Sequence, residues 1–198
     1  MVGRDEMSKM DEIKNLKKLK IIRTAMKLFV EQGFENTPTA QIAREAQVAN
    51  GTLFYHYKTK EDLINEIYLY VKKSMKDSIF ENINLSDNFE KIMKNIWKDM
   101  ISWGFENKME NLFLVKFHGS VYISKLTLEE LREDFKKGEE IFKKGFESGE
   151  FKKISPELFQ NITMNLLQSF LTEFYRIGRL DSELLEKSFQ IYWDAIKK

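Results

Sequence analysis

Residues 37–60 have the sequence TPTAQIAREAQVANGTLFYHYKTK and are the most informative part of the chain. A thin apolar face of isoleucine and alanine in its first half predicts a short helix that ends near Gln47. A second short helix is expected from about Asn50 to Tyr57. Two short helices joined by a tight turn are typical of a helix-turn-helix, whose second helix enters the major groove of DNA.

The outer side of that second helix carries groups suited to DNA. Thr52, Tyr55 and His56 offer hydrogen bonds and aromatic surface to bases and phosphates, and Lys60 follows them. Gly51 would let the backbone approach a phosphate closely. The aromatic residues could instead pack in a core around an incidental histidine, but the surrounding pattern favours DNA contact.

Charge is unevenly distributed along the chain. Residues 1–60 hold 11 lysines and arginines and 7 acidic residues, whereas residues 61–198 hold 21 and 24. This basic first third favours a polyanion as partner, although such an excess is common on solvated helices. The lysines between residues 14 and 20 are either a solvated helix face or an aid to DNA attraction.

The rest of the chain predicts an all-α protein with about nine helices. Apolar residues recur at helical spacing, and no convincing strand, repeat or low-complexity tract is present. Glycine, serine or aspartate marks several expected helix ends, with Ser86 expected to cap one helix. The helices are expected at about residues 11–32, 37–47, 50–57, 60–81, 89–105, 127–148, 156–177 and 182–196, with 112–122 either helix or loop.

Composition excludes several classes of protein. The chain has 198 residues, 42% hydrophobic and 32% charged, which is globular rather than disordered composition. It has no cysteine and two histidines, so a thiolate zinc site is excluded and a histidine-rich metal site is not expected. We expect no cofactor and no metal. With no apolar leader and no long apolar run, the expected location is the cytoplasm.

The N-terminal region also resembles a known family. Residues 21–67, through "AMKLFVEQGFENT", "IAREAQV" and "GTLFYHYKTKEDLI", resemble the DNA-binding domain of the TetR family of transcriptional regulators. The resemblance covers roughly the first third of the chain. It implies a helix-turn-helix DNA-binding domain at 1–60, followed by a helical ligand-binding and dimerisation domain at 61–198.

The resemblance assigns DNA contacts residue by residue. Thr37 and Lys60 would touch phosphate, while Leu53, Phe54 and Tyr57 would fix the recognition helix to the core, with Phe54 alternatively reaching sugar or a thymine methyl. Two departures are the Gln47 turn, where the family often has glycine, and Ala49-Asn50 in place of a Ser-Lys-like pair, which leaves Asn50 as the expected cap. The predicted DNA-binding residues are Thr37, Asn50, Gly51, Thr52, Tyr55, His56 and Lys60.

Aromatic residues in the second domain suggest an apolar ligand cavity between bundle helices, as the family implies. Ordinary core packing is the competing interpretation of each one. The predicted ligand residues are Trp97, Trp103, Phe113, Phe117, His118, Tyr122, Phe170 and Phe174, with Glu106, Glu110 or Glu173 able to counter a cationic ligand.

The last two helices have broad apolar faces. A surplus beyond their own core suggests a partner helix pair, and the family implies a two-fold dimer with a four-helix interface. Two ordinary terminal core helices are the alternative. The predicted dimerisation residues are Ile162, Leu166, Phe170, Leu185, Phe189 and Tyr192.

These features together predict a dimeric, sequence-specific DNA-binding regulator. By resemblance it is a repressor that a small, largely apolar ligand releases from a palindromic operator. One alternative is a helical interaction protein with a vestigial DNA-binding domain. The other is a helical-bundle enzyme using His118, but no Ser-His-Asp arrangement, Glu-x-x-His pair or phosphate-binding glycine loop is present.

Overall fold

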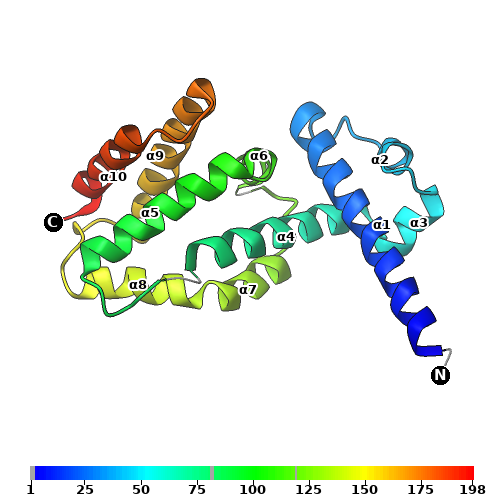
Figure 1. The fold of residues 1–198 in the computed structure, drawn as a ribbon, viewed down its shortest axis with the longest axis horizontal. Helices are drawn as coiled ribbons and strands as arrows, with labels where there is room; N and C mark the ends of the chain where they lie inside the picture. Colours follow the sequence, from blue (N-terminus) through cyan, green and yellow to red (C-terminus); the bar gives the residue numbers. More distant parts are fainter. Residues whose placement is uncertain (1–2, 81–82, 119) are drawn as a thin grey trace. The chain divides into compact units, whose positions relative to one another are not determined.

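The computed structural model of the chain describes residues 3–80, 83–118 and 120–198 (Figure 1). These residues form ten helices and no strand beyond one isolated bridge, which confirms the all-α fold class. None of the helices in these ranges combines the length and apolarity needed to cross a membrane. The helices are α1 (Gly3–Gln32), α2 (Thr39–Glu45), α3 (Asn50–His56), α4 (Lys60–Phe80), α5 (Phe89–Glu106), α6 (Lys108–Phe117), α7 (Lys125–Asp134), α8 (Lys136–Glu147), α9 (Pro156–Ile177) and α10 (Ser182–Ile196).

One of the expected helices is observed as two separate helices. The helix predicted over residues 127–148 is interrupted at Phe135, which separates α7 from α8 with φ −100° and ψ 8°. Its ring packs edge-on against Phe80, with centroids 5.9 Å apart. Phe135 is neither glycine nor proline, so no local signal in the sequence marks this break.

Several helix ends follow the expected rules. Gly33 adopts φ 84° after α1, and Gly178 adopts φ 72° after α9, so both helices end in the left-handed conformation that glycine favours. Ser155 caps α9 and Asp181 caps α10 through their side-chain oxygens. The prediction that Ser86 caps a helix was wrong. Asn88 caps α5 instead, and its Oδ1 accepts from Lys91 N at 2.8 Å.

The chain divides into two compact units. Unit 1 comprises Met1–Val71 and Met109–Leu128, and unit 2 comprises Lys72–Lys108 and Glu129–Lys198. Unit 1 therefore joins the first three helices to the first half of α4, to α6 and to the start of α7. Each unit buries its own apolar residues.

Unit 1 is organised around α1. Ile21, Ile22 and Phe29 of α1 are almost fully buried, and Phe117 of α6 packs edge-on against Phe29 with centroids 6.2 Å apart. Burial of such large apolar side chains is the main favourable contribution to folding. The α1 core therefore supports both α2 and α6 within this unit.

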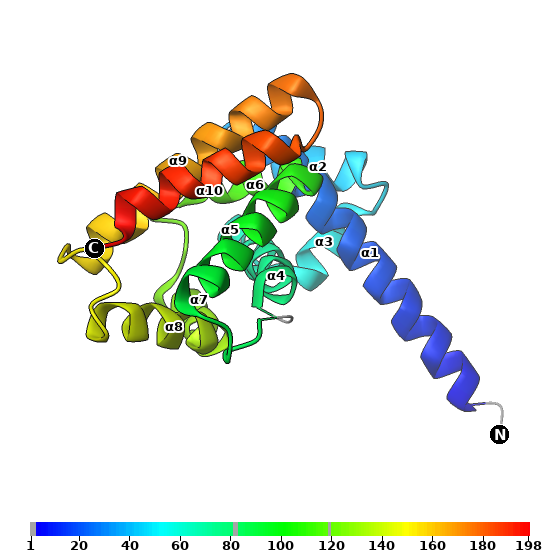
Figure 2. The ribbon, with the colours of Figure 1, turned by 60° about the vertical axis from the view of Figure 1, so that its left-hand side comes forward.

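Unit 2 is organised around α5, α9 and α10, and α9 and α10 run side by side (Figure 2). The ring of Trp97 on α5 stacks on Tyr192 of α10, with centroids 4.2 Å apart. Trp97 Nε1 also donates to Ser188 Oγ at 2.8 Å, so the buried indole N–H has a partner. These contacts tie α10 to α5.

Candidate nucleic-acid interface

The turn between α2 and α3 is tight and is held by backbone bonds. Ala46 N donates to the Ile42 carbonyl at 2.9 Å, and Val48 N donates to the Ala43 carbonyl at 3.0 Å. Between them Gln47 has φ 57°, the left-handed conformation that glycine adopts most easily. Glutamine therefore keeps the conformation expected of glycine at this place, at a cost in backbone strain.

α3 is fixed by two side chains and exposes two others. Leu53 and Tyr57 are 1% and 4% exposed, as expected for residues that anchor the helix. Phe54 was expected mainly in the core, but it is 44% exposed. Tyr55 is 74% exposed. A seven-residue helix thus presents two large aromatic side chains to solvent.

The phenol of Tyr57 is buried among the described residues without a hydrogen-bond partner. Burial raises the pKa of Tyr57, and the nearby carboxylate of Glu66 raises it further. The hydroxyl therefore stays protonated, and Tyr57 serves as an apolar anchor.

The amino end of α3 is open. Ala49 is the residue that precedes the helix, and within the described chain no side chain caps it. The expected capping role of Asn50 was wrong, because Asn50 is already the first helical residue. Gly51 is exposed, and a Cβ built on it would meet no atom within 4 Å. The first amide hydrogens of α3 are therefore accessible to an external acceptor.

Thr37 lies in the core rather than on the surface. Its side chain is 0% exposed, and its hydroxyl donates to the Gly33 carbonyl at 2.6 Å. A phosphate could not reach that hydroxyl, so the structure does not place Thr37 for the predicted contact. Thr39, the first residue of α2, is half-buried and offers a hydroxyl two residues later. The sequence has a threonine on each side of Pro38, and this was the signal that could have pointed to Thr39.

Lys60 begins α4 and lies against an aromatic ring. Its Nζ is 4.2 Å from the centroid of Phe34, a favourable cation–π contact. The helix start itself is held by Thr59 and Asp62, each of which accepts a backbone N–H of the other at 3.0 Å. The Thr59–Asp62 pair caps the helix without Lys60, and the phosphate contact of Lys60 stays a prediction.

The remaining predicted residues of α3 lie at or near the surface. Thr52 is half-buried, and His56 is half-buried with its ring edge-on to Tyr55 at 5.3 Å between centroids. Asn50, Gly51 and Tyr55 lie on the same short helix. The structure therefore brings six of the seven predicted DNA-binding residues to α3 and the start of α4, and leaves Thr37 inside.

The eight residues predicted to contact a ligand are divided between the two units. Phe113, Phe117, His118 and Tyr122 belong to unit 1, and the other four belong to unit 2. Five of the eight are nearly fully buried in their own unit, as the core-packing alternative expects: Trp97, Trp103, Phe113, Phe117 and Phe174. Of the acids weighed beside them, Glu173 accepts from Arg176 at 2.8 Å, which lowers the pKa of Glu173.

Unit 2 contains a cavity of about 670 Å³. It lies among α4, α5, α8 and α9, and none of the eight predicted ligand residues lines it. Phenylalanine and methionine dominate its wall. The lining residues are Lys72, Met75, Ile79, Phe80, Ile96, Met100, Phe135, Gly138, Glu139, Phe142, Lys143, Phe146, Glu147, Pro156, Phe159, Gln160, Thr163 and Met164.

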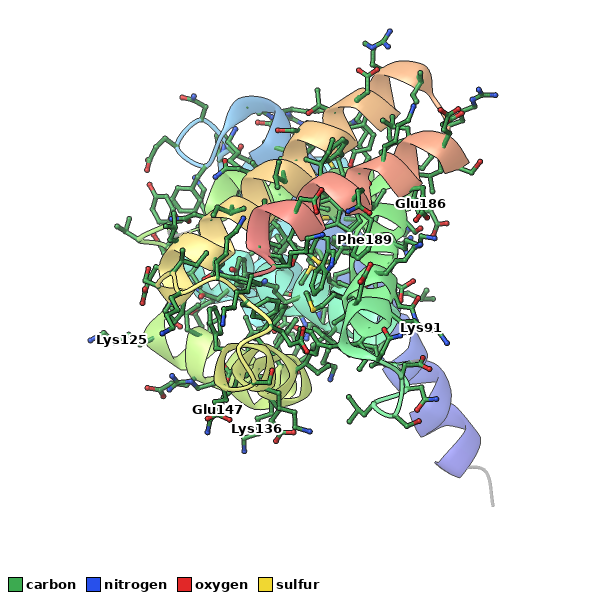
Figure 3. The ribbon with its side chains drawn as sticks, turned by 90° about the vertical axis from the view of Figure 1, so that its left-hand side faces the viewer. Lys91, Lys125, Lys136, Glu147, Glu186 and Phe189 are labelled. Carbon is green, nitrogen blue, oxygen red and sulfur yellow. The ribbon has the colours of Figure 1, made fainter. Side chains whose placement is uncertain are left out.

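The residues predicted for a dimer interface differ in exposure. Phe189, labelled in Figure 3, and Tyr192 are 1% exposed and belong to the core of unit 2. The other four, Ile162, Leu166, Phe170 and Leu185, are half-buried. Apolar side chains that stay exposed on α9 and α10 are Leu158, Ile177 and Ile191.

No group of three or more histidine, aspartate or glutamate side chains that could hold a metal ion occurs among the residues that the structure describes.

The chain is similar to known transcriptional regulators. Residues 21–67 match the family model described as bacterial regulatory proteins, tetR family. The uncharacterized HTH-type transcriptional regulator YhgD of Bacillus subtilis (strain 168) is 23% identical over 178 residues, covering 87% of this chain and 92% of that protein. QacR of Staphylococcus aureus, another HTH-type transcriptional regulator, is 42% identical over 48 residues, 24% of this chain and 26% of QacR.

The similarity of fold extends over nearly the whole chain. A crystal structure of a tetR family protein from Shewanella sp. PV-4 matches with a TM-score of 0.79 and 28% identity, covering 92% of this chain and 98% of that chain. A second, from Marinobacter aquaeolei VT8, has a TM-score of 0.85 at 17% identity.

Proposed function

We propose that this chain, which belongs to the TetR family of bacterial regulatory proteins, is a dimeric repressor. A small, largely apolar ligand would release it from a palindromic operator. It is a transcriptional regulator with a DNA-binding helix-turn-helix, and it is not an enzyme. The dimer, the palindrome, the repression and the ligand are the proposal.

The observation that carries the proposal is the two-sided character of α3. Leu53 and Tyr57 are buried and hold the helix, while Tyr55 and Phe54 are 74% and 44% exposed to solvent. These aromatic side chains are open to a partner outside the protein. In the major groove they would contact thymine methyl groups and sugars, while Thr52 reads base edges.

Orientation on DNA would come from phosphate contacts around α3. The uncapped amides at Asn50 and Gly51 and the ammonium of Lys60 are the candidate donors. Such contacts fix the register of the helix and depend strongly on salt. Lys60 would exchange part of its contact with Phe34 for a phosphate.

A two-fold dimer would present two copies of α3 to the two halves of a palindrome. The apolar side chains of α9 and α10 that are exposed or half-buried form the face proposed for the dimer. Ile191→Glu places a charge on this face at a position 51% exposed, so it should shift the protein to the monomer. Leu85→Glu, on a loop residue 52% exposed, is the matched control and should leave the assembly unchanged in sedimentation velocity.

The DNA site is tested by Tyr55→Ala and Lys60→Ala. Each should weaken binding to a selected operator while leaving the fold and the dimer intact, and Lys60→Ala should also lower the salt slope by about one phosphate contact. Lys125→Ala, an exposed lysine on α7, is the control and should bind as the unchanged protein does. Unchanged binding in both variants would refute this assignment, and weak binding without sequence preference would favour a vestigial domain.

A further inference from the structure

The cavity of unit 2 has the size and walls of a site for a small organic molecule. Its volume of about 670 Å³ lies within the range of roughly 300–1,000 Å³ typical of ligand sites. The rings of Phe142, Phe146 and Phe159 meet in its wall, with centroids 5.3–5.4 Å apart between Phe159 and each of the others. Such a wall favours a hydrocarbon part of the ligand.

Four charged side chains line the cavity, and they differ in exposure. Glu139, Lys143 and Glu147 are exposed, and Figure 3 shows Glu147 projecting from the outer side of α8. Water and salt screen such charges, so they contribute little to a ligand inside. Lys72 is the exception, because its side chain is half-buried on α4.

Lys72 carries its charge in an apolar setting. Its Nζ lies 5.2 Å from the centroid of the Phe135 ring, another residue of the cavity wall. Burial lowers the pKa of Lys72 to about 8, so the group is still mostly protonated at neutral pH but costs free energy there. An anion that reaches this ammonium would gain more than it would at the protein surface.

We propose that the ligand of this cavity is an amphipathic monocarboxylate, whose hydrocarbon tail lies among the phenylalanines and whose carboxylate pairs with Lys72. The inference rests on the proposed ligand-responsive function and specifies the chemical class of the ligand. A cationic ligand would meet a like charge at Lys72. A neutral ligand would not gain the charge-assisted contact that a carboxylate gains at Lys72.

The other polar groups of the lining favour a compact headgroup. Among the described residues of the lining there is no arginine, whereas phosphate sites commonly combine several cationic or backbone donors. The hydroxyl of Thr163 is buried and donates to the Phe159 carbonyl at 2.9 Å. One half-buried lysine suits a carboxylate better than a phosphate ester, which favours several cationic donors.

The test measures by calorimetry, without DNA, how tightly three probes bind to the full chain. The three probes share one hydrocarbon tail. Laurate, lauryl alcohol and lauryltrimethylammonium, each below its micelle concentration, differ only in the headgroup. Laurate should bind roughly 10- to 100-fold more tightly than the alcohol, as expected for a charge-assisted contact, and the ammonium should bind most weakly. Equal binding of laurate and the alcohol, tighter binding of the ammonium, or no binding by any probe would overturn the proposal.

Two substitutions locate the carboxylate. Lys72→Met keeps the length of the side chain and should abolish the preference for laurate over the alcohol, whereas Lys143→Met, at an exposed lining lysine, should retain it. If Lys72→Met fails to fold, the headgroup series on the unchanged protein still decides. Addition of laurate to the operator complex separates the two proposals: binding of laurate with no release of DNA would leave the ligand class standing and refute ligand-controlled repression.

Discussion

Gly51→Ala should change stability and DNA binding in opposite directions. In the free protein an added Cβ at Gly51 meets no atom within 4 Å, and the residue is exposed, so the methyl group causes no clash. Alanine in a helix loses less backbone entropy on folding than glycine and is more stable by roughly 0.5–1 kcal/mol. Because Gly51 lies in the first turn of α3, we expect the lower end, a gain of about 0.5 kcal/mol.

On DNA the same methyl group stands where the backbone would approach a phosphate. Loss of one hydrogen bond to a charged group costs roughly 1.5–3 kcal/mol, which weakens binding about 10- to 150-fold. Urea unfolding reports the first effect, and fluorescence anisotropy with a labelled operator at fixed salt reports the second. If Gly51→Ala is folded and binds the operator as tightly as the unchanged chain, the start of α3 does not approach DNA and the reasoning fails.

Three further predictions concern single groups. Asn65→Ala should lower the free energy of unfolding in urea by roughly 2–4 kcal/mol, because three hydrogen bonds are lost. The Asn65 amide accepts at 2.8 Å from Ser124 N and from the Thr127 hydroxyl, and it donates at 2.9 Å to the Tyr122 carbonyl. A loss below about 0.5 kcal/mol would show that water replaces these bonds. Gln47→Gly should remove left-handed strain and raise the free energy of unfolding by up to about 1 kcal/mol, and a loss of stability would contradict that reading of φ 57°. Partial burial lowers the pKa of Lys72 to about 8, so its charge destabilises the folded state below that pH and ceases to do so as pH rises towards the unfolded value of 10.5. Between pH 8 and pH 10 the free energy of unfolding of the unchanged protein should therefore rise relative to that of Lys72→Met, and a constant difference would contradict this.

The features that sequence could predict are those made by neighbouring residues. Gly33, Ser155 and Asp181 end or begin helices through bonds within three or four residues, so their identity is enough. The anchoring of α3 by Leu53 was expected from the resemblance to the family, and its burial agrees with that expectation. The cap at Asn88 was missed because Ser86 and Asn88 are both good capping residues and only the backbone path selects between them.

The cavity could not be predicted, because spacing tells that a side chain is buried but not what fills the space beside it. Trp97 and Phe113 are as apolar as Phe142 and Phe146, yet the first pair is enclosed by neighbouring helices and the second pair borders a void. One signal was present: Lys72 stands four residues after Tyr68 and three before Met75, on the apolar side of α4. A lysine at such a position is uncommon unless it has a partner.

The central claim is that the chain is a two-fold, sequence-specific DNA-binding regulator. The most direct measurement is selection of bound sequences from random duplex DNA, with the full chain at near-physiological salt, after unfolding and refolding to remove any ligand. We expect enrichment of a palindrome whose two half-sites are spaced for a pair of recognition helices. A folded protein that enriches no sequence, or a single half-site without symmetry, would contradict it.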